Sequence, residues 1–334
     1  NSFSICDEMK MINGLVWPIP VLNLVDSASG VKAGDYLALK DPSRVGYPIL
    51  AYQKVDSVEN INDTEKEAMA RKIYGTSDNR HPGVANFLNQ GSVAIAGEVV
   101  VKNYSFYEEL FPKTFQTASQ IRAKFLERNW TKVVAFQTRN PMHRAHEELC
   151  KIAKEQVGAD GVLIHMLLGK LKTGDIPADV RDSAIRKMVE IYFEPNTVMV
   201  SGYGFDMLYA GPREALLHAI IRQNAGCTHL IVGRDHAGVG DYYSPFEAQE
   251  IFRSKNVCDA LEIEIFEADH TAYSKKLEKV VMMKDATDHS PDDFILLSGS
   301  RVRELLQQGE SLPPEFARPE VAKILMDFYR GLTD

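Results

Sequence analysis

Two histidines and an arginine near the middle of the chain have the types and spacing of an oxyanion-binding site. His143 and His146 are three residues apart, so they lie on one face of a helix. Arg139 precedes them and carries a planar, permanently charged group that suits phosphate-like oxyanions. Pro141 favours the first position of that helix, where free N–H groups and the helix dipole attract anions. The stretch therefore predicts contact with phosphate groups.

The histidine pair has two alternative interpretations. It could supply two ligands to a metal, or it could simply form a polar face of the helix. No third metal ligand is obvious in the sequence, and the pair does not form an H-E-x-x-H pattern. We favour phosphate contact and expect no metal held by the protein itself, while both alternatives stay open.

A second polar loop follows the apolar run that ends at Val232. It has the sequence Gly-Arg-Asp-His-Ala-Gly over residues 233–238. Its glycines let the backbone approach a ligand closely, and Arg234 and His236 supply positive donors. Asp235 could accept a hydrogen bond from a ribose hydroxyl or orient Arg234. The stretch could also be a plain turn, but two loops that both carry Arg and His favour a shared site.

Strands and helices alternate around both loops. Continuous apolar runs predict buried strands at residues 132–136, 161–168, 197–200, 228–232 and 261–266. Helical spacing predicts helices at residues 117–128, 141–156, 177–192 and 212–223. This alternation is typical of a parallel sheet covered on both faces, whose ligands bind at the carboxyl ends of the strands. We therefore expect an α/β fold with a Rossmann-like parallel-sheet catalytic domain.

The regions on either side of this alternation have other patterns. Residues 1–113 contain short strands and turns, with a proline-broken edge strand at 15–24. Residues 269–334 are helix-rich and include Leu-Ser-Gly-Ser-Arg-Val-Arg over 297–303, which could touch phosphates or cap a helix. We therefore predict a β-rich N-terminal domain, a catalytic domain over 114–268 and a small helix-rich C-terminal subdomain.

Composition narrows the classes of function. The formal net charge is −8 at pH 7, which disfavours general binding to nucleic acids or membrane surfaces. No apolar run approaches the roughly 20 residues of a membrane span, and no basic-then-apolar segment opens the chain. Four cysteines lack C-x-x-C spacing, so a disulfide is not expected. We expect a cytoplasmic protein with no nucleic-acid or membrane partner.

Several common motifs are absent from the sequence. There is no G-x-x-x-x-G-K-[ST], so the chain is not a P-loop kinase. No G-x-G-x-x-G follows a predicted strand, and no G-x-S-x-G supplies a hydrolase nucleophile. Any nucleotide chemistry must therefore depend on the two polar loops.

Taken together, these motifs resemble a known family. A strand followed by H-x-x-H on the next helix resembles the nucleotidyltransferase superfamily that includes class I aminoacyl-tRNA synthetases. The longer string Gln-Thr-Arg-Asn-Pro-Met-His-Arg-Ala-His over 137–146, with the loop at 233–238, resembles the narrower ATP sulfurylase (sulfate adenylyltransferase) family. Residues 209–215 and 298–303 are also similar to that family.

The resemblance covers nearly the whole chain and has consequences for its architecture. It implies that residues 1–113 form a domain of the pseudouridine-synthase-and-archaeosine-transglycosylase (PUA-like) type, which is expected to begin several dozen residues late. The cysteine-rich zinc insert that some members carry after the second loop is missing, so no protein-bound zinc is expected. The APS-kinase domain that is appended in bifunctional relatives is not expected either.

The reaction implied by the resemblance is adenylyl transfer from MgATP to sulfate, giving adenosine 5′-phosphosulfate (APS) and pyrophosphate. Sulfate is already ionised and needs no general base, so catalysis would depend on positioning and charge stabilisation. Mg²⁺ would arrive with ATP and bridge its phosphate oxygens. Family members are often homo-oligomers, which we also expect here. The sequence leaves open whether the enzyme activates sulfate or makes ATP from APS and pyrophosphate.

The resemblance also assigns roles to single residues. Sulfate would be bound by Gln137, Arg139 and the backbone of Ala237. The catalytic set would be Thr138, Arg139, Asn140, His143 and His146, with the two histidines stabilising charge as pyrophosphate leaves. ATP would be bound by Gln137, Thr138, Arg139, Asn140, Gly233, Arg234, Asp235, His236 and Met283. Val280 takes the gating position, where many relatives carry an aromatic residue. Arg213 could face the sulfate pocket or only begin a helix.

Two other functions are compatible with the motifs. Another adenylyl- or cytidylyltransferase of the H-x-x-H superfamily would use the same helix with a different acceptor. Gln137 and Arg139 ahead of the histidines favour an inorganic oxyanion as acceptor. A non-catalytic nucleotide-binding protein would be expected to have lost Arg139 or a histidine, and both are present.

Overall fold

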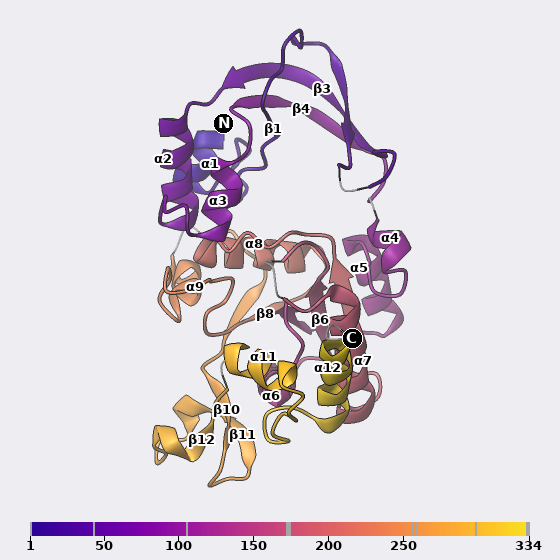
Figure 1. Cartoon of the computed structure of the whole chain (residues 1–334), viewed down its shortest axis with the longest axis vertical. Helices are drawn as coiled ribbons and strands as arrows, with labels where there is room; N and C mark the ends of the chain where they lie inside the picture. The colour runs from indigo at the N-terminus through magenta and orange to yellow at the C-terminus, as the bar shows by residue number, and fades with distance from the viewer. Residues whose placement is uncertain are drawn as a thin grey trace. The chain divides into compact units, whose positions relative to one another are not determined.

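The computed structural model describes residues 2–331 apart from 43, 105, 172–174, 255, 256, 258 and 298, so Ser298 of the C-terminal motif lies outside the described residues. The chain falls into two compact units (Figure 1). The first unit consists of Asn1–Pro112, Met207–Leu217 and Asp235–Leu261. The second unit consists of Lys113–Asp206, His218–Arg234 and Glu262–Asp334. This grouping does not test the three contiguous domains expected from the sequence, which stay a prediction.

The second unit is built on a five-stranded parallel sheet in the order β7-β6-β5-β8-β9. Its strands are β5 (Val133–Thr138), β6 (Gly161–Leu167), β7 (Val198–Tyr203), β8 (His229–Val232) and β9 (Glu264–Glu267). Strands β6 and β8 are buried along their whole length, as continuous apolar strands in a covered sheet should be. The predicted α/β class with a Rossmann-like parallel sheet is confirmed.

The strand order changes direction at β5. From β5 the chain continues through β6 and β7, which extend the sheet from one edge of β5. Strand β8 then pairs with the other edge of β5. Such a reversal leaves a crevice at the carboxyl ends of the two strands, where ligands of α/β sheets bind. The residues that follow β5 and β8 are the two polar loops, so Gln137 and Gly233 lie at neighbouring strand ends.

The helices of the alternating region follow the predicted ranges. They are α5 (Ala118–Glu127), α6 (Arg144–Val157), α7 (Ala178–Tyr192) and α8 (Gly211–Asn224). Thr117 begins α5 with a capping box that it shares with Gln120. The predicted start of α6 at Pro141 is wrong, because His143 has an extended backbone and occupies the N-cap position. Pro141 therefore belongs to the loop and not to the helix.

The C-terminal part of the second unit combines helices with short strands. A three-stranded antiparallel sheet has the order β11-β10-β12. The elements are β10 (Thr271–Ser274), β11 (Lys279–Met282), η2 (Met283–Asp285), η3 (Pro291–Asp293), β12 (Phe294–Ile295), α11 (Gly299–Gln307) and α12 (Pro319–Arg330). Helices α11 and α12 agree with the helix-rich character expected of this region, and its status as a separate subdomain stays a prediction. The strands were not predicted, because two to four residues are too few to show an alternating pattern. Helix α12 packs on α7, and α6 contacts β10 and β11.

The first unit contains a four-stranded antiparallel sheet in the order β1-β4-β3-β2. Its elements are α1 (Ser2–Glu8), β1 (Leu24–Val25), β2 (Tyr36–Lys40), β3 (Ile49–Asn60), α2 (Asp63–Tyr74), α3 (Pro82–Leu88), β4 (Val93–Val101), α4 (Tyr107–Leu110), α9 (Glu247–Glu250) and η1 (Ile251–Arg253). The β-rich character is as predicted, but the edge strand over 15–24 is reduced to β1. Pro18 and Pro20 have no N–H for a ladder, and the N–H of Trp17 bonds instead to Met9.

His81 connects the separate segments of the first unit. Its Nδ1 accepts hydrogen bonds from the N–H groups of Gly83 and Val84 and so caps α3. Its Nε2 lies 3.1 Å from the carbonyl oxygen of Tyr209 and 3.3 Å from the hydroxyl of Tyr243. One buried imidazole thus ties the sequence-distant segments to the N-terminal helices. The pKa of His81 is lowered by burial, which favours this neutral, bridging form.

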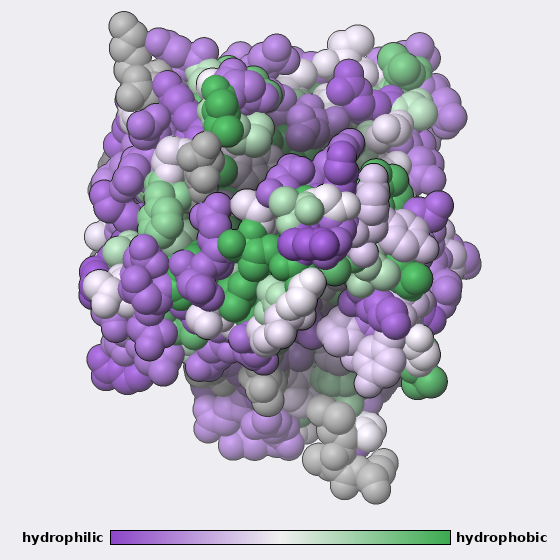
Figure 2. All heavy atoms as spheres, turned by 90° about the horizontal axis from the view of Figure 1, so that it is seen from above, coloured by the Kyte–Doolittle hydropathy of each residue, from purple (hydrophilic) through white to green (hydrophobic). Residues whose placement is uncertain are grey.

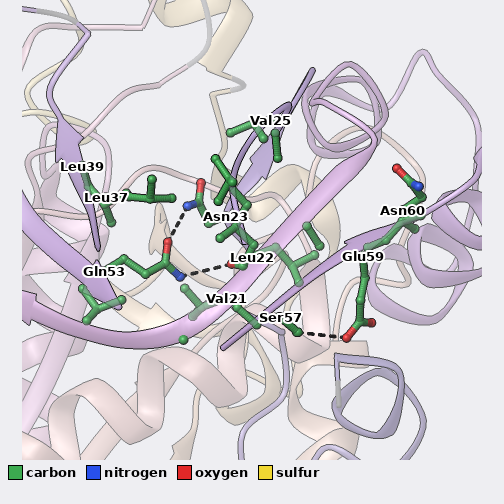
Figure 3. A pocket seen from close by; sticks show the side chains of 18 of the residues that line it. Val21, Leu22, Asn23, Val25, Leu37, Leu39, Gln53, Ser57, Glu59 and Asn60 are labelled. Atoms are coloured by element: carbon green, nitrogen blue, oxygen red, sulfur yellow. Dashed lines mark hydrogen bonds between the residues drawn. The ribbon is translucent and has the colours of Figure 1, made fainter. Parts of the chain in front are cut away.

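A groove of about 1140 Å³ lies against the sheet of the first unit (Figure 3). Gln53 crosses it, accepting a hydrogen bond from Asn23 at 2.8 Å and donating one to the carbonyl oxygen of Ile95 at 3.1 Å. None of the site residues predicted from the sequence lines this groove. Figure 2 shows hydrophobic side chains among hydrophilic ones on the face seen from above. Among the described residues, no helix combines the length and hydrophobicity needed to cross a membrane.

Candidate active site

The first polar loop begins on the last residues of β5. Gln137 and Thr138 are the final residues of that strand, and Thr138 is buried. The Thr138 hydroxyl donates to the carbonyl oxygen of Asn140 at 2.8 Å and accepts from the N–H of Asn140 at 3.2 Å. This hydroxyl therefore holds the turn that follows, in which Arg139 lies. Within the described structure, Thr138 shapes the loop.

His143 and His146 stack on each other beyond this turn. Their ring centroids are 3.8 Å apart with an interplanar angle of 31°. His143 also stacks on Phe316, and His146 lies 5.3 Å from the ring of Phe136. Among the described residues, the Nδ1 atoms of both histidines are buried without a hydrogen-bond partner. Unsatisfied buried polar atoms cost free energy and are typical of sites that await a ligand or water.

Burial sets the protonation state of the histidine pair. It lowers the pKa of His146 to about 4. Burial also lowers the pKa of His143 well below its ordinary value, and the neighbouring His146 and His270 lower it further. Both imidazoles are therefore neutral at physiological pH without a ligand. A bound anion would raise both values, because it favours the charged form.

A cavity of about 440 Å³ in the second unit brings four of the predicted residues together. Arg139, Asn140, His143 and His146 all line it. The opposite wall comes from sequence-distant residues that include Asp175, Arg303 and Phe316. Arg303 belongs to the C-terminal motif that could touch phosphates. Asp175 belongs to a polar loop after β6 that could form a flap or only a solvated loop, whereas Phe316 had no recognisable signal in the sequence, because only the fold brings it to α6.

The start of α6 differs from the anion site expected from the sequence. The N–H of Arg144 donates to the carbonyl oxygen of Phe316 at 2.9 Å. The N–H groups of His146 and Glu147 donate to the carbonyl oxygen of His143 at 2.9 and 3.1 Å. These donors are used inside the protein. An anion in the cavity would therefore be bound by the cationic and imidazole side chains that line it more than by the helix terminus.

The second polar loop is divided between the two units. Gly233 and Arg234 follow β8 in the second unit. Asp235 and Ala237, in the first unit, have left-handed backbones with φ of 55° and 57°. The N–H of Asp235 donates to the carbonyl oxygen of Pro245 at 2.7 Å. Two non-glycine residues with positive φ indicate a constrained loop, as often found at ligand sites.

The predicted gating residue Val280 and the predicted ATP-binding residue Met283 lie in and directly after the three-stranded sheet of the second unit. Val280 is buried on β11, where it pairs with Tyr273. Met283 follows that strand and packs against a small core of Ala272, Ala286 and Phe294. Helix α6, which carries the histidine pair, contacts this sheet. The sheet and the cavity thus belong to one part of the second unit.

Arg213 does not have the sulfate-facing role that the sequence allowed. In the first unit its guanidinium donates to the carbonyl oxygens of Pro18 at 3.0 Å and Cys6 at 2.6 Å. These bonds fix the N-terminal segment on the start of α8, so the structural alternative is the better description of Arg213.

Metal ligation by the histidine pair gains no partner from the structure. In the part of the chain that the structure describes, no group of three or more His, Cys, Asp or Glu side chains could hold a metal ion.

Comparison with known proteins identifies the family. Residues 112–328 match the model of the ATP-sulfurylase family, and residues 2–104 match that of the PUA-like domain. The chain is 61% identical over 329 residues to the sulfate adenylyltransferase of Alcanivorax borkumensis, which covers 98% of this chain and 82% of the relative. The chain belongs to the ATP-sulfurylase family.

Further comparisons agree with membership of the ATP-sulfurylase family. The sulfate adenylyltransferase of Allochromatium vinosum is 61% identical over 332 residues, covering 99% of this chain and 84% of the relative. A solved structure of a hexameric APS kinase from Thiobacillus denitrificans superposes with a TM-score of 0.70 at 21% identity. That match covers 98% of this chain and 56% of the solved chain. At this identity it supports the fold alone.

Proposed function

We propose that this protein transfers the adenylyl group of MgATP to sulfate, giving APS and pyrophosphate, as a sulfate adenylyltransferase. The observation that carries this function is the cavity in which Arg139, Asn140 and the His143–His146 pair converge at the carboxyl end of a parallel strand. It supplies a fixed cation and two imidazoles to phosphate groups, at the edge of the sheet where ligands bind.

The chemistry is an in-line displacement at phosphorus. A sulfate oxygen forms a bond to the α-phosphorus of ATP. The bond from that phosphorus to the oxygen that bridges the α- and β-phosphorus atoms breaks, and pyrophosphate leaves with this oxygen. Sulfate needs no deprotonation, so the site must align two anions and stabilise the charge that develops on the leaving group. Arg139 suits that task because its charge is permanent and its donors are planar.

Individual roles form part of the proposal. Sulfate would be bound by Gln137, Arg139 and the backbone of Ala237. The leaving pyrophosphate would be stabilised by His143 and His146, as hydrogen-bond donors while they are neutral. Nucleotide contacts would come from Gln137, Thr138, Arg139, Asn140, Gly233, Arg234, Asp235, His236 and Met283. Val280 would take the gating position, and its burial on β11 supports a packing contribution there.

Cofactor, assembly and location are also proposed. Mg²⁺ enters as part of the MgATP substrate and bridges phosphate oxygens. A homo-oligomer and a cytoplasmic location are inferred from the family resemblance and the composition, and light scattering of the purified protein would test the former. The same site can run toward APS or toward ATP, because pyrophosphate can attack the phosphorus of APS and displace sulfate, which reverses the transfer.

Acceptor competition separates this function from its nearest rival. We expect pyrophosphate release from ATP with sulfate, and continuous AMP and pyrophosphate formation with molybdate, whose adenylyl adduct hydrolyses. Nicotinamide mononucleotide and pantetheine phosphate should release none. Release with either of those acceptors and not with sulfate would assign the chain to another H-x-x-H transferase. If none of these acceptors causes pyrophosphate release, a non-catalytic nucleotide-binding protein is favoured.

A further inference from the structure

Gln137 is connected to a buried polar layer that no motif predicted. Its Nε2 donates to the hydroxyl of Tyr203, the last residue of β7, at 3.4 Å. The Tyr203 hydroxyl lies 3.4 Å from Nε2 of His218, on α8. In the sheet register, Gln137 pairs with His165, and His165 pairs with the residue two before Tyr203. These side chains therefore share one face of the sheet.

The layer contains a buried cation. The guanidinium carbon of Arg222 lies 4.3 Å from the ring centroid of Tyr203, and its Nη1 donates to the carbonyl oxygen of His218 at 3.3 Å. Arg222 is fully buried, and its Nε and Nη2 have no hydrogen-bond partner among the described residues. His165 packs against Tyr203 with ring centroids 4.6 Å apart, and burial lowers its pKa well below the ordinary value. Arg222 is thus a buried charge beside the Tyr203 ring, in a layer that also holds the neutral His165.

The hydrogen-bond directions constrain Gln137. If the Tyr203 hydroxyl gives its proton to Nε2 of His218, its oxygen can only accept from the side chain of Gln137. Gln137 must then turn its Nε2 toward Tyr203, which uses one N–H and leaves the second to bind an oxyanion. The buried guanidinium adds positive potential that solvent screens weakly, in a chain whose net charge of −8 repels sulfate.

We propose that Tyr203, His218 and Arg222 form a positioning layer for sulfate, in which Tyr203 fixes the Gln137 amide and Arg222 attracts the dianion. This inference depends on the proposed function, because it assumes that Gln137 binds sulfate. The layer acts on the sulfate-facing N–H of Gln137 and through its field, and none of Tyr203, His218 and Arg222 is among the proposed nucleotide contacts. Its loss should therefore change sulfate binding selectively.

The test compares Tyr203→Phe, which removes only a hydroxyl, with wild type and with Tyr36→Phe, which removes an exposed hydroxyl from β2. We expect Tyr203→Phe to raise the KM for sulfate about tenfold, with less than a twofold change in kcat and in the KM for ATP. Tyr36→Phe should leave all three unchanged. An unchanged KM for sulfate, or an equal rise in both KM values, would overturn the proposal.

Two further variants test the route of the effect. In a Gln137→Ala background, Tyr203→Phe should raise the KM for sulfate no further, because its effect passes through the missing amide. Full additivity would contradict the inference. Arg222→Lys should retain more sulfate affinity than Arg222→Met at equal thermal stability, and equal losses would contradict the electrostatic part. Wild-type protein without sulfate-dependent pyrophosphate release would instead overturn the proposed function itself.

Discussion

The His143–His146 pair is a stacked, neutral pair in the structure, and this changes how it can act on phosphates. A neutral imidazole offers one N–H donor and no net charge. The permanent positive charge in the cavity comes from arginine side chains such as Arg139. The pair would gain charge only as a bound anion raises the pKa of each ring. We therefore assign fixed charge to Arg139 and adjustable hydrogen bonding to the histidines.

Arg139→Ala should lower kcat/KM for sulfate about 10²- to 10³-fold, because it removes a charged, planar donor from the reacting anions. Arg139→Lys should restore part of the loss, since it keeps the charge but not the fork of donors. The measurement is the initial rate of pyrophosphate release. Arg71→Ala, which breaks an exposed ion pair on α2, is the matched control and should be unaffected. An Arg139→Ala enzyme with wild-type activity would contradict the role proposed for Arg139.

Acid sensitivity provides a test of the buried His146 ring. Its pKa in the folded protein is about 4, below the ordinary value of 6.5. The unfolded chain therefore binds the proton first, so folding stability is complete above pH 6.5 and falls as the pH decreases toward 4. Between these values His146 should account for about 3 kcal/mol of lost unfolding free energy. Urea titrations at several pH values measure it.

The matching variant is His146→Gln, which cannot titrate in this range. Its unfolding free energy should fall less steeply than that of the wild type between pH 6.5 and 4. Parallel pH profiles for the two proteins would mean that the ring titrates normally and is not desolvated in solution.

At the scale of elements, helix α6 is held to the C-terminal helices by a buried carboxylate. Glu147 is fully buried and receives two hydrogen bonds from Arg318, at 2.9 and 2.8 Å, and one from Lys151 at 2.6 Å. Burial raises the pKa of Glu147, but these bonds outweigh it and lower the value overall. Arg318 is the N-cap residue of α12, so the ion pair joins α12 to the helix that carries the histidines.

Arg318→Ala should destabilise the protein by about 2 kcal/mol, because it removes a bidentate partner from a buried carboxylate. The loss should be largest above pH 4.5 and shrink at lower pH, since stability from a lowered carboxyl pKa disappears as the group is protonated. Thermal unfolding at pH 7 measures the effect. Lys323→Ala, which breaks an exposed pair on α12, is the control. Equal melting temperatures for the two variants would contradict a stabilising ion pair between Arg318 and Glu147.

The sequence predicted these elements best where a pattern repeats along a segment. Apolar segments identified all five parallel strands, and spacing identified the helices between them. The start of α6 was misplaced because a proline suits both the first helical position and the loop before it. The strands β10 to β12 were missed because they are too short. Arg213 was ambiguous because a charge at a helix start has the same signal whichever partner it finds.

At the scale of the whole molecule, the site depends on contacts between residues far apart in the sequence. The motif supplied Arg139, Asn140, His143 and His146, and the fold brings them to one cavity. The stacking of Phe316 on His143 joins residues that no local pattern connects. The same is true of the Tyr203 layer behind Gln137, built from two strands and α8. Motifs therefore indicate which residues contact the ligands, and topology decides which other residues hold them in place.

The anionic character of the chain makes the local charges decisive. A net charge of −8 repels both sulfate and ATP at long range. Binding must then come from arginines that face the ligands or, as with Arg222, lie buried behind them. The proposed adenylyl transfer therefore requires a site that binds two anions and joins them.

The most direct test of this central claim is product analysis with ATP and isotopically labelled sulfate. We predict equimolar APS and pyrophosphate, with the sulfate label in APS and none in pyrophosphate. Added pyrophosphate should drive APS back to ATP. Formation of ADP and phosphate, or turnover of ATP that does not depend on sulfate, would contradict it.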